Sequence, residues 1–256
     1  MPSTISRPRV RLFASLVVLT AAVVSFAPAQ EWVSGIPWPT PPTVDPGPVG
    51  GPPSDALVLL GDGRDLSQWE RADQWQRHDG YITVAGDPLN ATKRAFGDCQ
   101  LHVEWAAPAE IQGAGQQRGN SGIYLMGRYE VQILDSYNNP TYPDGQAAAI
   151  YKQNPPLVNA SRKPGEWQTY DIVFEAPRFA ADGKLLRPAL ITVLHNGVLV
   201  QNHRPIQGET SFFEPPRYRA HPAKLPLAIQ FHNNPVRFRN IWIRELPPSD
   251  APPPKK

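Results

Sequence analysis

Leu190-Ile-Thr-Val-Leu-His-Asn-Gly-Val-Leu-Val-Gln201 is the most diagnostic stretch of this 256-residue chain. Apolar residues lead into and out of the central Asn196-Gly197 pair. Asn and Gly both accept the positive φ values that a two-residue type I′ turn requires, so the pair predicts a tight β-hairpin. We also expect His195, which directly precedes the turn, to be exposed.

Short strand-like segments of the same kind recur over most of the chain, separated by Gly, Pro, Asn and Asp. They are predicted at 56–60, 74–78, 81–84, 101–105, 121–125, 129–134, 167–175, 190–195, 198–201, 225–232 and 236–246. No ten-residue window carries the apolar stripe of an amphipathic helix. Many short strands without helices indicate an all-β protein with a single domain, a β-sandwich or jelly roll.

Proline and glycine mark the two ends of the predicted folded unit. Residues 30–55 are rich in both and are predicted to be a linker, because proline lacks the N–H that a strand or helix needs. Residues 247–256 are a matching Pro-rich tail. The jelly-roll domain is therefore predicted over residues 56–246.

Residues 1–29 have the pattern of a secretory signal peptide. Arg7, Arg9 and Arg11 precede an apolar run at 12–26, and small residues follow. This run of about fifteen residues is shorter than the roughly twenty of a membrane span. We therefore expect an exported protein, periplasmic or secreted, without stable membrane insertion.

Charge and cysteine content narrow the partners. A formal net charge of +2 gives no argument for nucleic acid and suits a neutral substrate such as a carbohydrate. The single cysteine, Cys99, can form neither an intramolecular disulfide nor a cysteine metal cluster. No nucleotide cofactor is expected, and a divalent metal ion is left open.

The segment Tyr129–Asp135 alternates apolar and polar side chains. In a strand, Glu130 and Gln132 would share one face while the apolar residues between them share the other. A carboxylate beside an amide on the face away from the core favours a site for a polar ligand. Asp135 follows an odd step, so it joins that face only through a bulge, or it forms a turn at the strand end.

Two other predicted strands place polar residues in the same manner. In residues 101–105, Glu104 lies opposite the apolar positions and is a candidate for the floor of the site. In residues 227–232, Gln230 and His232 share a face, and histidine can transfer a proton in either direction near neutral pH.

Arg237 and Arg239 also share one face of a strand. They could bind sugar oxygens or pair with carboxylates on neighbouring strands. Further hydrogen bonds to a ligand could come from Asn120, Ser121 and Tyr124.

Six ordered motifs resemble the 3-keto-disaccharide hydrolase domain family. They are Leu57-Val-Leu-Leu-Gly-Asp-Gly-Arg-Asp-Leu-Ser-Gln-Trp69, Asn120-Ser-Gly-Ile-Tyr124, Tyr129-Glu-Val-Gln-Ile-Leu-Asp-Ser136, Gly165-Glu-Trp-Gln-Thr-Tyr-Asp-Ile172, Thr192-Val-Leu-His-Asn-Gly-Val198 and Pro235-Val-Arg-Phe-Arg-Asn-Ile-Trp242. The resemblance covers nearly all of residues 56–246 and implies a concanavalin A-like jelly roll. It also implies cleavage of glycosides whose sugar is oxidised at C3.

A ketone at C3 acidifies the proton on C2. A base can remove that proton, the aglycone then leaves C1 by β-elimination, and addition of water completes a net hydrolysis. Such a site needs a base, a donor to the enolate oxygen and an acid for the leaving group. Glu130 is the predicted base, His232 the predicted acid and Glu104 a third catalytic candidate. Lys93 follows Thr92 as in a Thr-Lys pair of the family, and it would stabilise the enolate.

The chain departs from the family beside the histidine. His232 is flanked by Phe231 and Asn233, where the family typically has Asp and Gly. An acidic neighbour that could orient the imidazole or hold a metal is therefore missing there. Side chains of ligand type remain, without the spacing of a defined metal motif, at Glu104, Glu130, Asp135 and His232.

Two other functions remain open on the sequence. In an ordinary glycoside hydrolase, Glu130 and Asp135 would form the carboxylate pair. A retaining pair lies about 5 Å apart, whereas five extended residues span roughly 16 Å. Alternatively, the domain is a non-catalytic carbohydrate-binding module, because one fold serves many functions.

Overall fold

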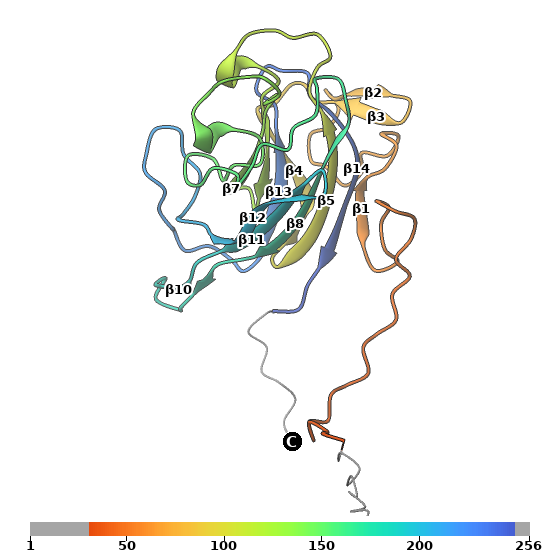
Figure 1. Ribbon diagram of the computed structural model, residues 1–256, viewed down its shortest axis with the longest axis vertical. Helices are drawn as coiled ribbons and strands as arrows, with labels where there is room; N and C mark the ends of the chain where they lie inside the picture. Colours follow the sequence, from red (N-terminus) through yellow and green to blue (C-terminus); the bar gives the residue numbers. More distant parts are fainter. Residues whose placement is uncertain (1–30, 249–256) are drawn as a thin grey trace, which may run out of the picture. The chain divides into compact units, whose positions relative to one another are not determined.

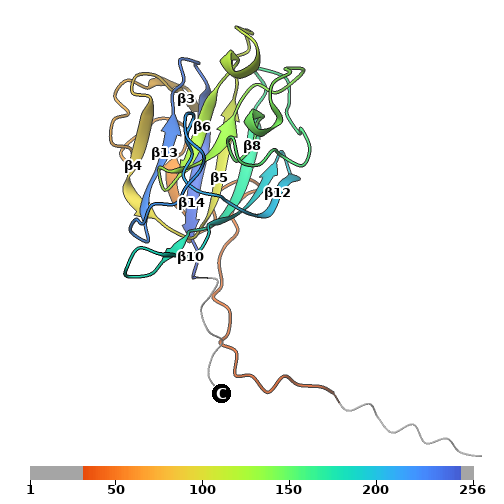
Figure 2. The same cartoon turned by 90° about the vertical axis from the view of Figure 1, so that its left-hand side faces the viewer.

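Two antiparallel β-sheets pack face to face in the computed structural model, which describes residues 31–248 (Figures 1 and 2). The predicted signal peptide (1–29) lies outside the described residues, as does 249–256 in the predicted tail. Residues 40–248 belong to one compact unit, and residues 31–39 belong to a separate one without regular secondary structure. None of the helices within 31–248 has the length and apolarity to cross a bilayer.

The larger sheet has eight strands. Seven follow the spatial order β12-β11-β8-β5-β14-β3-β2, and β1 pairs with β14 as well. Their bounds are β1 Leu57–Leu60, β2 Gln76–His78, β3 Tyr81–Thr83, β5 Cys99–Ala106, β8 Gln168–Glu175, β11 Leu190–His195, β12 Val198–Pro205 and β14 Arg237–Glu245.

The smaller sheet has four strands in the order β4-β13-β6-β7. Their bounds are β4 Leu89–Phe96, β6 Ser121–Leu125, β7 Tyr129–Ile133 and β13 Leu225–Gln230. A separate ribbon pairs β9 (Arg178–Phe179) with β10 (Leu185–Arg187). Two single-turn 3₁₀ helices, η1 (Gly115–Gln117) and η2 (Pro143–Gly145), lie in the long connections.

The core lies between the two sheets. Trp105 and Tyr170 of the large sheet and Tyr129 and Val131 of the small sheet all belong to it, and each is at most 1% exposed. Fully burying one side chain of this size contributes about 1.5–3 kcal/mol, so the core dominates the stability of the sandwich. This architecture confirms the predicted all-β jelly-roll class.

The predicted Asn-Gly hairpin is present as β11 and β12. Asn196 and Gly197 have φ values of 52° and 78°, and His195 pairs with Val198 across the turn. The expected exposure of His195 was wrong, because its side chain is 1% exposed. It alternates in phase with the buried Ile191 and therefore points into the core.

Burial shapes the chemistry of His195. Its Nε2 atom lies 2.8 Å from Gln168 Oε1. Burial, reinforced by the charge of Arg162, lowers its pKa to about 4, because the charged imidazolium is costly to bury. His195 is thus a neutral structural residue near pH 7.

Strand β4 was not predicted. Its sequence, Leu-Asn-Ala-Thr-Lys-Arg-Ala-Phe, is poor in β-branched and aromatic residues and does not alternate clearly. It forms because β13 supplies a long antiparallel partner along its length, with Ala228 opposite Ala91 and Leu225 opposite Phe96. Tertiary pairing therefore overrides a weak local preference.

The second half of the predicted linker lies against β14. The Gly50 carbonyl accepts hydrogen bonds from Asn240 Nδ2 at 2.8 Å and from Trp242 Nε1 at 3.2 Å. Nearby, Arg244 Nε donates to Asp55 at 2.6 Å. Residues 40–55 therefore contact the large sheet as well as preceding it in the chain.

Candidate active site

Strand register brings polar side chains together on the face of the small sheet that points away from the core. Ala228 of β13, Tyr124 of β6 and Glu130 of β7 stand opposite one another in a row. In the next row, Gly122 of β6 is opposite Gln132 of β7. The predicted alternation of β7 therefore holds, since Tyr129 and Val131 belong to the core on the other face.

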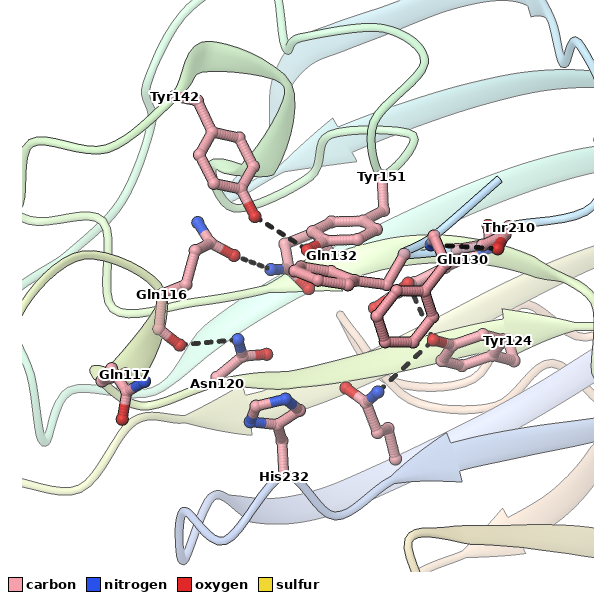
Figure 3. A pocket seen from close by; sticks show the side chains of 14 residues that line it. Gln116, Gln117, Asn120, Tyr124, Glu130, Gln132, Tyr142, Tyr151, Thr210 and His232 are labelled. Atoms are coloured by element: carbon pink, nitrogen blue, oxygen red, sulfur yellow. Dashed lines mark hydrogen bonds between the residues drawn. The ribbon is translucent and has the colours of Figure 1, made fainter. Parts of the chain in front are cut away.

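A cavity of about 620 Å³ opens over this face (Figure 3). Strands β6, β7 and β13 form its floor, while η1, residues 142–151 and residues 210–213 form its walls and mouth. Its lining residues are Gln116, Gln117, Asn120, Tyr124, Glu130, Gln132, Tyr142, Tyr151, Thr210, Ser211, Phe212, Phe213, Gln230 and His232. Six of the residues predicted from sequence thus share one cavity, namely Asn120, Tyr124, Glu130, Gln132, Gln230 and His232.

Glu130 is the buried carboxyl group of this cavity, with 3% of its surface exposed. Burial raises its pKa to about 8, although a 2.8 Å hydrogen bond from the Tyr124 hydroxyl to Oε2 acts in the opposite direction. No Lys or Arg side chain lines the cavity in the described part of the chain. A carboxylate without a cation beside it is a comparatively strong base once ionised.

Gly122 makes room for this carboxyl group. A Cβ atom at position 122 would lie 2.5 Å from Glu130 Oε1, closer than any real Cβ contact. Gly122 sits within a paired strand and not in a turn, so its role is the close approach of a neighbouring side chain.

Amide groups surround the buried end of the cavity. Gln132 Nε2 donates to Gln116 Oε1 at 3.0 Å, and Gln116 Nε2 donates to the Gly145 carbonyl at 2.9 Å. Turned by 180°, the Gln132 amide would donate to Glu130 Oε1 at 3.1 Å and to the Ser121 carbonyl at 2.9 Å. Such groups are well suited to fixing sugar hydroxyl and carbonyl oxygens.

A pair of tyrosines closes one side. The hydroxyls of Tyr142 and Tyr151 lie 2.7 Å apart, and a dashed line joins them in Figure 3. Burial, assisted by the hydrogen bond with Tyr142, raises the pKa of Tyr151 well above its usual range. On the floor, burial and the Glu130 carboxyl likewise raise the pKa of Tyr124. Both groups therefore stay protonated and can donate hydrogen bonds at physiological pH.

His232 lies two residues after the end of β13 and is exposed at the cavity. Within residues 31–248, no side chain or backbone group hydrogen-bonds to its ring. Its backbone carbonyl accepts from Asn234 Nδ2 at 2.8 Å, which anchors the turn instead. The imidazole is therefore free to meet a ligand.

The other predicted site residues lie outside this cavity. Glu104 was predicted to lie on the floor of the site, but it is not near Glu130. It is on β5 in the large sheet, where Arg239 Nε donates to its carboxylate at 2.6 Å and Asn240 Nδ2 donates at 2.8 Å. Burial opposes ionisation there, but these two hydrogen bonds and the Arg239 charge lower the pKa of Glu104 overall. The second arginine, Arg237, donates to the Gly165 carbonyl at 2.7 Å.

Asp135 is also held elsewhere. Arg118 Nε donates to its Oδ2 at 2.6 Å, and the pair borders a separate cavity of about 110 Å³. The side chain of Ser121 donates to the Gln230 carbonyl at 2.6 Å and so joins β6 to β13. Lys93 is exposed on β4 and does not line the cavity.

Eight cavity residues were missed by the sequence analysis, two from η1 and six from loops. They are Gln116 and Gln117 in η1, and Tyr142, Tyr151, Thr210, Ser211, Phe212 and Phe213 in loops. No periodicity marks loop residues, so only their polar or aromatic character could have indicated them. Within residues 31–248, no three His, Cys, Asp or Glu side chains are grouped so that they could hold a metal ion.

A jelly roll whose cavity combines amide and hydroxyl groups with aromatic rings is compatible with carbohydrate binding. Comparisons with known proteins support a carbohydrate-active, hydrolase-like protein. The model of the 3-keto-alpha-glucoside-1,2-lyase-like domain matches residues 56–244. The chain belongs to this family, which confirms the resemblance found in the sequence.

Solved structures support the same class. A candidate glycosyl hydrolase from Parabacteroides distasonis is 49% identical with a TM-score of 0.79, and the match covers 83% of this chain and 95% of that one. Two further candidate glycosyl hydrolases from the same organism are 20% and 18% identical, with TM-scores of 0.52 and 0.54. These matches cover 74% and 78% of this chain and 100% and 96% of the other chains, and they show the fold alone. No curated protein matches the chain.

Proposed function

We propose that this protein cleaves 3-keto-glycosides by removing the C2 proton and eliminating the aglycone from C1. The observation that carries the proposal is the buried Glu130 carboxyl, whose pKa is raised to about 8 within a cavity lined by neutral hydrogen-bonding groups. A base that must remove a weakly acidic carbon-bound proton works best with a pKa near the operating pH.

Elimination of the aglycone comes first, and hydration of the sugar follows. Ionised Glu130 takes the C2 proton, and the electron pair of the C–H bond forms an enolate with the C3 oxygen. The enolate then restores the C3 carbonyl and forms the C1–C2 double bond, while the C1–O bond breaks and the leaving oxygen takes a proton. Water adds to C1, and a proton returns to C2, so the net result is hydrolysis.

Each role has a group in the cavity. His232 is exposed with a free ring and is the proposed acid for the leaving oxygen. Lys93 lies outside the cavity, so stabilisation of the enolate is assigned to neutral donors instead. The amides of Gln132 and Gln116 and the protonated Tyr151 hydroxyl are of the kind that stabilise a developing oxyanion.

The two-carboxylate alternative has weak support. Glu130 is the one carboxylate among the cavity-lining residues in the described part of the chain. Asp135 is paired with Arg118 at a different cavity. The elimination mechanism needs only one carboxylate, so it fits the lining better.

Export remains part of the proposal. The basic and apolar pattern of residues 1–29 supports removal of a signal peptide and release into the periplasm or the medium. The mass of the protein recovered from the native host tests this, because an intact N-terminus on a cytoplasmic protein would contradict it.

A paired assay tests the substrate class. We expect the purified protein to release the aglycone from a 3-keto-glucoside but not from the parent glucoside, and we expect Glu130→Gln to abolish release. Equal rates on both glucosides would contradict the proposal and favour direct hydrolysis. Binding of glucosides without any turnover would indicate a carbohydrate-binding module. Repeating the assay with a chelator decides whether a metal ion takes part.

A further inference from the structure

Two phenylalanines stand exposed at the cavity mouth. Phe212 is 61% exposed and Phe213 is 91% exposed, yet both line the cavity. Their rings meet edge to face with centroids 5.0 Å apart and planes at 82°. Burial of large apolar side chains stabilises a fold, so two phenylalanines left in water give up a substantial contribution to folding.

The loop that carries these rings is firmly held. The Glu130 backbone N–H donates to Thr210 Oγ1 at 3.0 Å, and Thr210 N donates to the Arg128 carbonyl at 2.8 Å. The Glu209 carboxylate contacts Arg128 at 2.5 Å and Arg219 at 2.9 Å. The rings are therefore presented by an anchored loop and not by a loose one.

The base of the loop is closed by backbone contact. Glu209 and Arg217 form an antiparallel bridge. Just before it, a Cβ atom at Gly208 would lie 2.3 Å from Arg217 N, so only glycine permits this approach. The loop returns on itself within a few residues, which limits how far Phe212 and Phe213 can move.

Lys152 fixes the orientation of one ring. Its Nζ lies 3.7 Å from the Phe212 ring centroid and donates to the Phe212 carbonyl at 3.1 Å. One face of Phe212 is thus covered by a cation, which leaves the rest of the ring and Phe213 to meet a ligand. Tyr142 and Tyr151 line the same cavity and add aromatic surface.

The contact that anchors the loop also places Phe212 and Phe213 near Glu130, the proposed base. Thr210 contacts the backbone of Glu130 and precedes Phe212 by two residues. In the proposed function, Glu130 acts at C2, and the aglycone is attached to the adjacent C1. In the binding mode proposed here, the sugar lies on the cavity floor beside Glu130 and Gln132, and its C1 substituent points to the mouth, where Phe212 and Phe213 lie.

We propose that Phe212 and Phe213 form an aglycone subsite that selects a flat, aromatic aglycone. This inference rests on the proposed function, since it needs C2 beside Glu130. Aromatic stacking contributes about 0.5–1.5 kcal/mol per ring pair beyond simple burial, which corresponds to roughly twofold to tenfold in affinity or in kcat/KM.

The test uses the full chain with two substrates, 4-nitrophenyl 3-keto-glucoside and methyl 3-keto-glucoside. Variants are Phe212→Ala, Phe213→Ala and the corresponding Leu substitutions, which keep apolar volume but remove the ring. Leu186→Ala is the matched control, because Leu186 is 66% exposed on β10 and does not line the cavity. Each variant is compared with wild type on the same substrate, so that the better leaving ability of nitrophenol cancels.

We expect the Phe variants to lower kcat/KM roughly twofold to tenfold for the aryl substrate, with little change for the methyl substrate and none in the control. Equal losses on both substrates would overturn the inference and assign the rings to the sugar, and unchanged rates would overturn it too. If both substrates are inert, the proposed function has failed instead. Calorimetric binding of the parent aryl and methyl glucosides then decides the subsite, with selective loss of aryl binding as the supporting result.

Discussion

Glu130 is the residue on which the proposed mechanism depends, because only its ionised form can accept the C2 proton. Burial raises the pKa of this carboxyl to about 8, so its basic form is the minority below that pH. If ionised Glu130 is the base, kcat/KM for a 3-keto-glucoside should rise about tenfold per pH unit below pH 8 and level off above it. A profile measured from pH 5.5 to 9.5 tests this. A rate that instead falls as pH rises through 8 would make Glu130 the acid.

The same titration affects stability. The Glu130 pKa is raised from 4.5 to about 8 by folding, so the folded state keeps a proton that the unfolded state releases. The stabilisation is complete below pH 4.5 and is lost as pH rises through about 8. Glu130→Gln removes this titration. Its free energy of unfolding should exceed that of wild type increasingly from pH 4.5 to 8, by a few kcal/mol at about 1.4 kcal/mol per pH unit.

Urea unfolding of both proteins at several pH values measures the difference. Gln is nearly isosteric with Glu and keeps an acceptor for the Tyr124 hydroxyl, so packing changes little. A difference that is constant with pH would show that Glu130 titrates alike in the folded and unfolded states.

Some site residues could be predicted singly, and others could not. Alternation placed Glu130 and Gln132 on the ligand face, because side-chain direction in a strand depends only on parity. Glu104 follows the same alternation but sits on the other sheet, and parity cannot tell which sheet a strand joins. Asp135 remained ambiguous because its partner, Arg118, lies 17 residues away.

Strand β6 contributes space to the site as well as side chains. Gly122→Ala would place a methyl group 2.5 Å from the present position of Glu130 Oε1 and force the carboxylate to move. Overpacking of this kind typically costs about 1–3 kcal/mol. We expect a loss of kcat/KM of at least roughly tenfold, since small misplacements of a catalytic group have large effects.

Gly61→Ala is the matched control for this strand prediction. An added Cβ at Gly61 would meet only Val58 Cγ1, at an ordinary contact distance of 3.8 Å. Its activity should equal that of wild type. Full activity of Gly122→Ala together with an unchanged pH profile would show that the position of the Glu130 carboxylate is not critical.

Elements with strong local signals were predictable, and elements made by pairing were not. The β11–β12 hairpin follows from Asn196-Gly197, because the turn chemistry is local. Strand β4 has no such signal and depends on β13. The loop at residues 210–213 escaped prediction for the same reason, since its position depends on contacts with Arg128 and Glu130.

At the scale of the whole molecule, the sandwich explains why the small sheet carries the cavity. Strands β6, β7 and β13 use one face for the core and the other for the cavity. The large sheet instead uses its second face for ion pairs such as Arg239–Glu104 and for contacts with residues 40–55. The fold class could be predicted from the many short alternating strands. Which sheet carries the cavity could not be predicted, because it depends on how the strands pair.

In the proposed mechanism the C2–H bond breaks before the aglycone leaves, with Glu130 as the base. Cleavage of a 3-keto-glucoside in D₂O tests it directly, with the C2 hydrogen of the product followed by mass spectrometry and NMR. We expect deuterium at C2 above the level in product incubated without the protein, and no release of the aglycone by Glu130→Gln. Release of the aglycone with the original C2 hydrogen fully retained would contradict it.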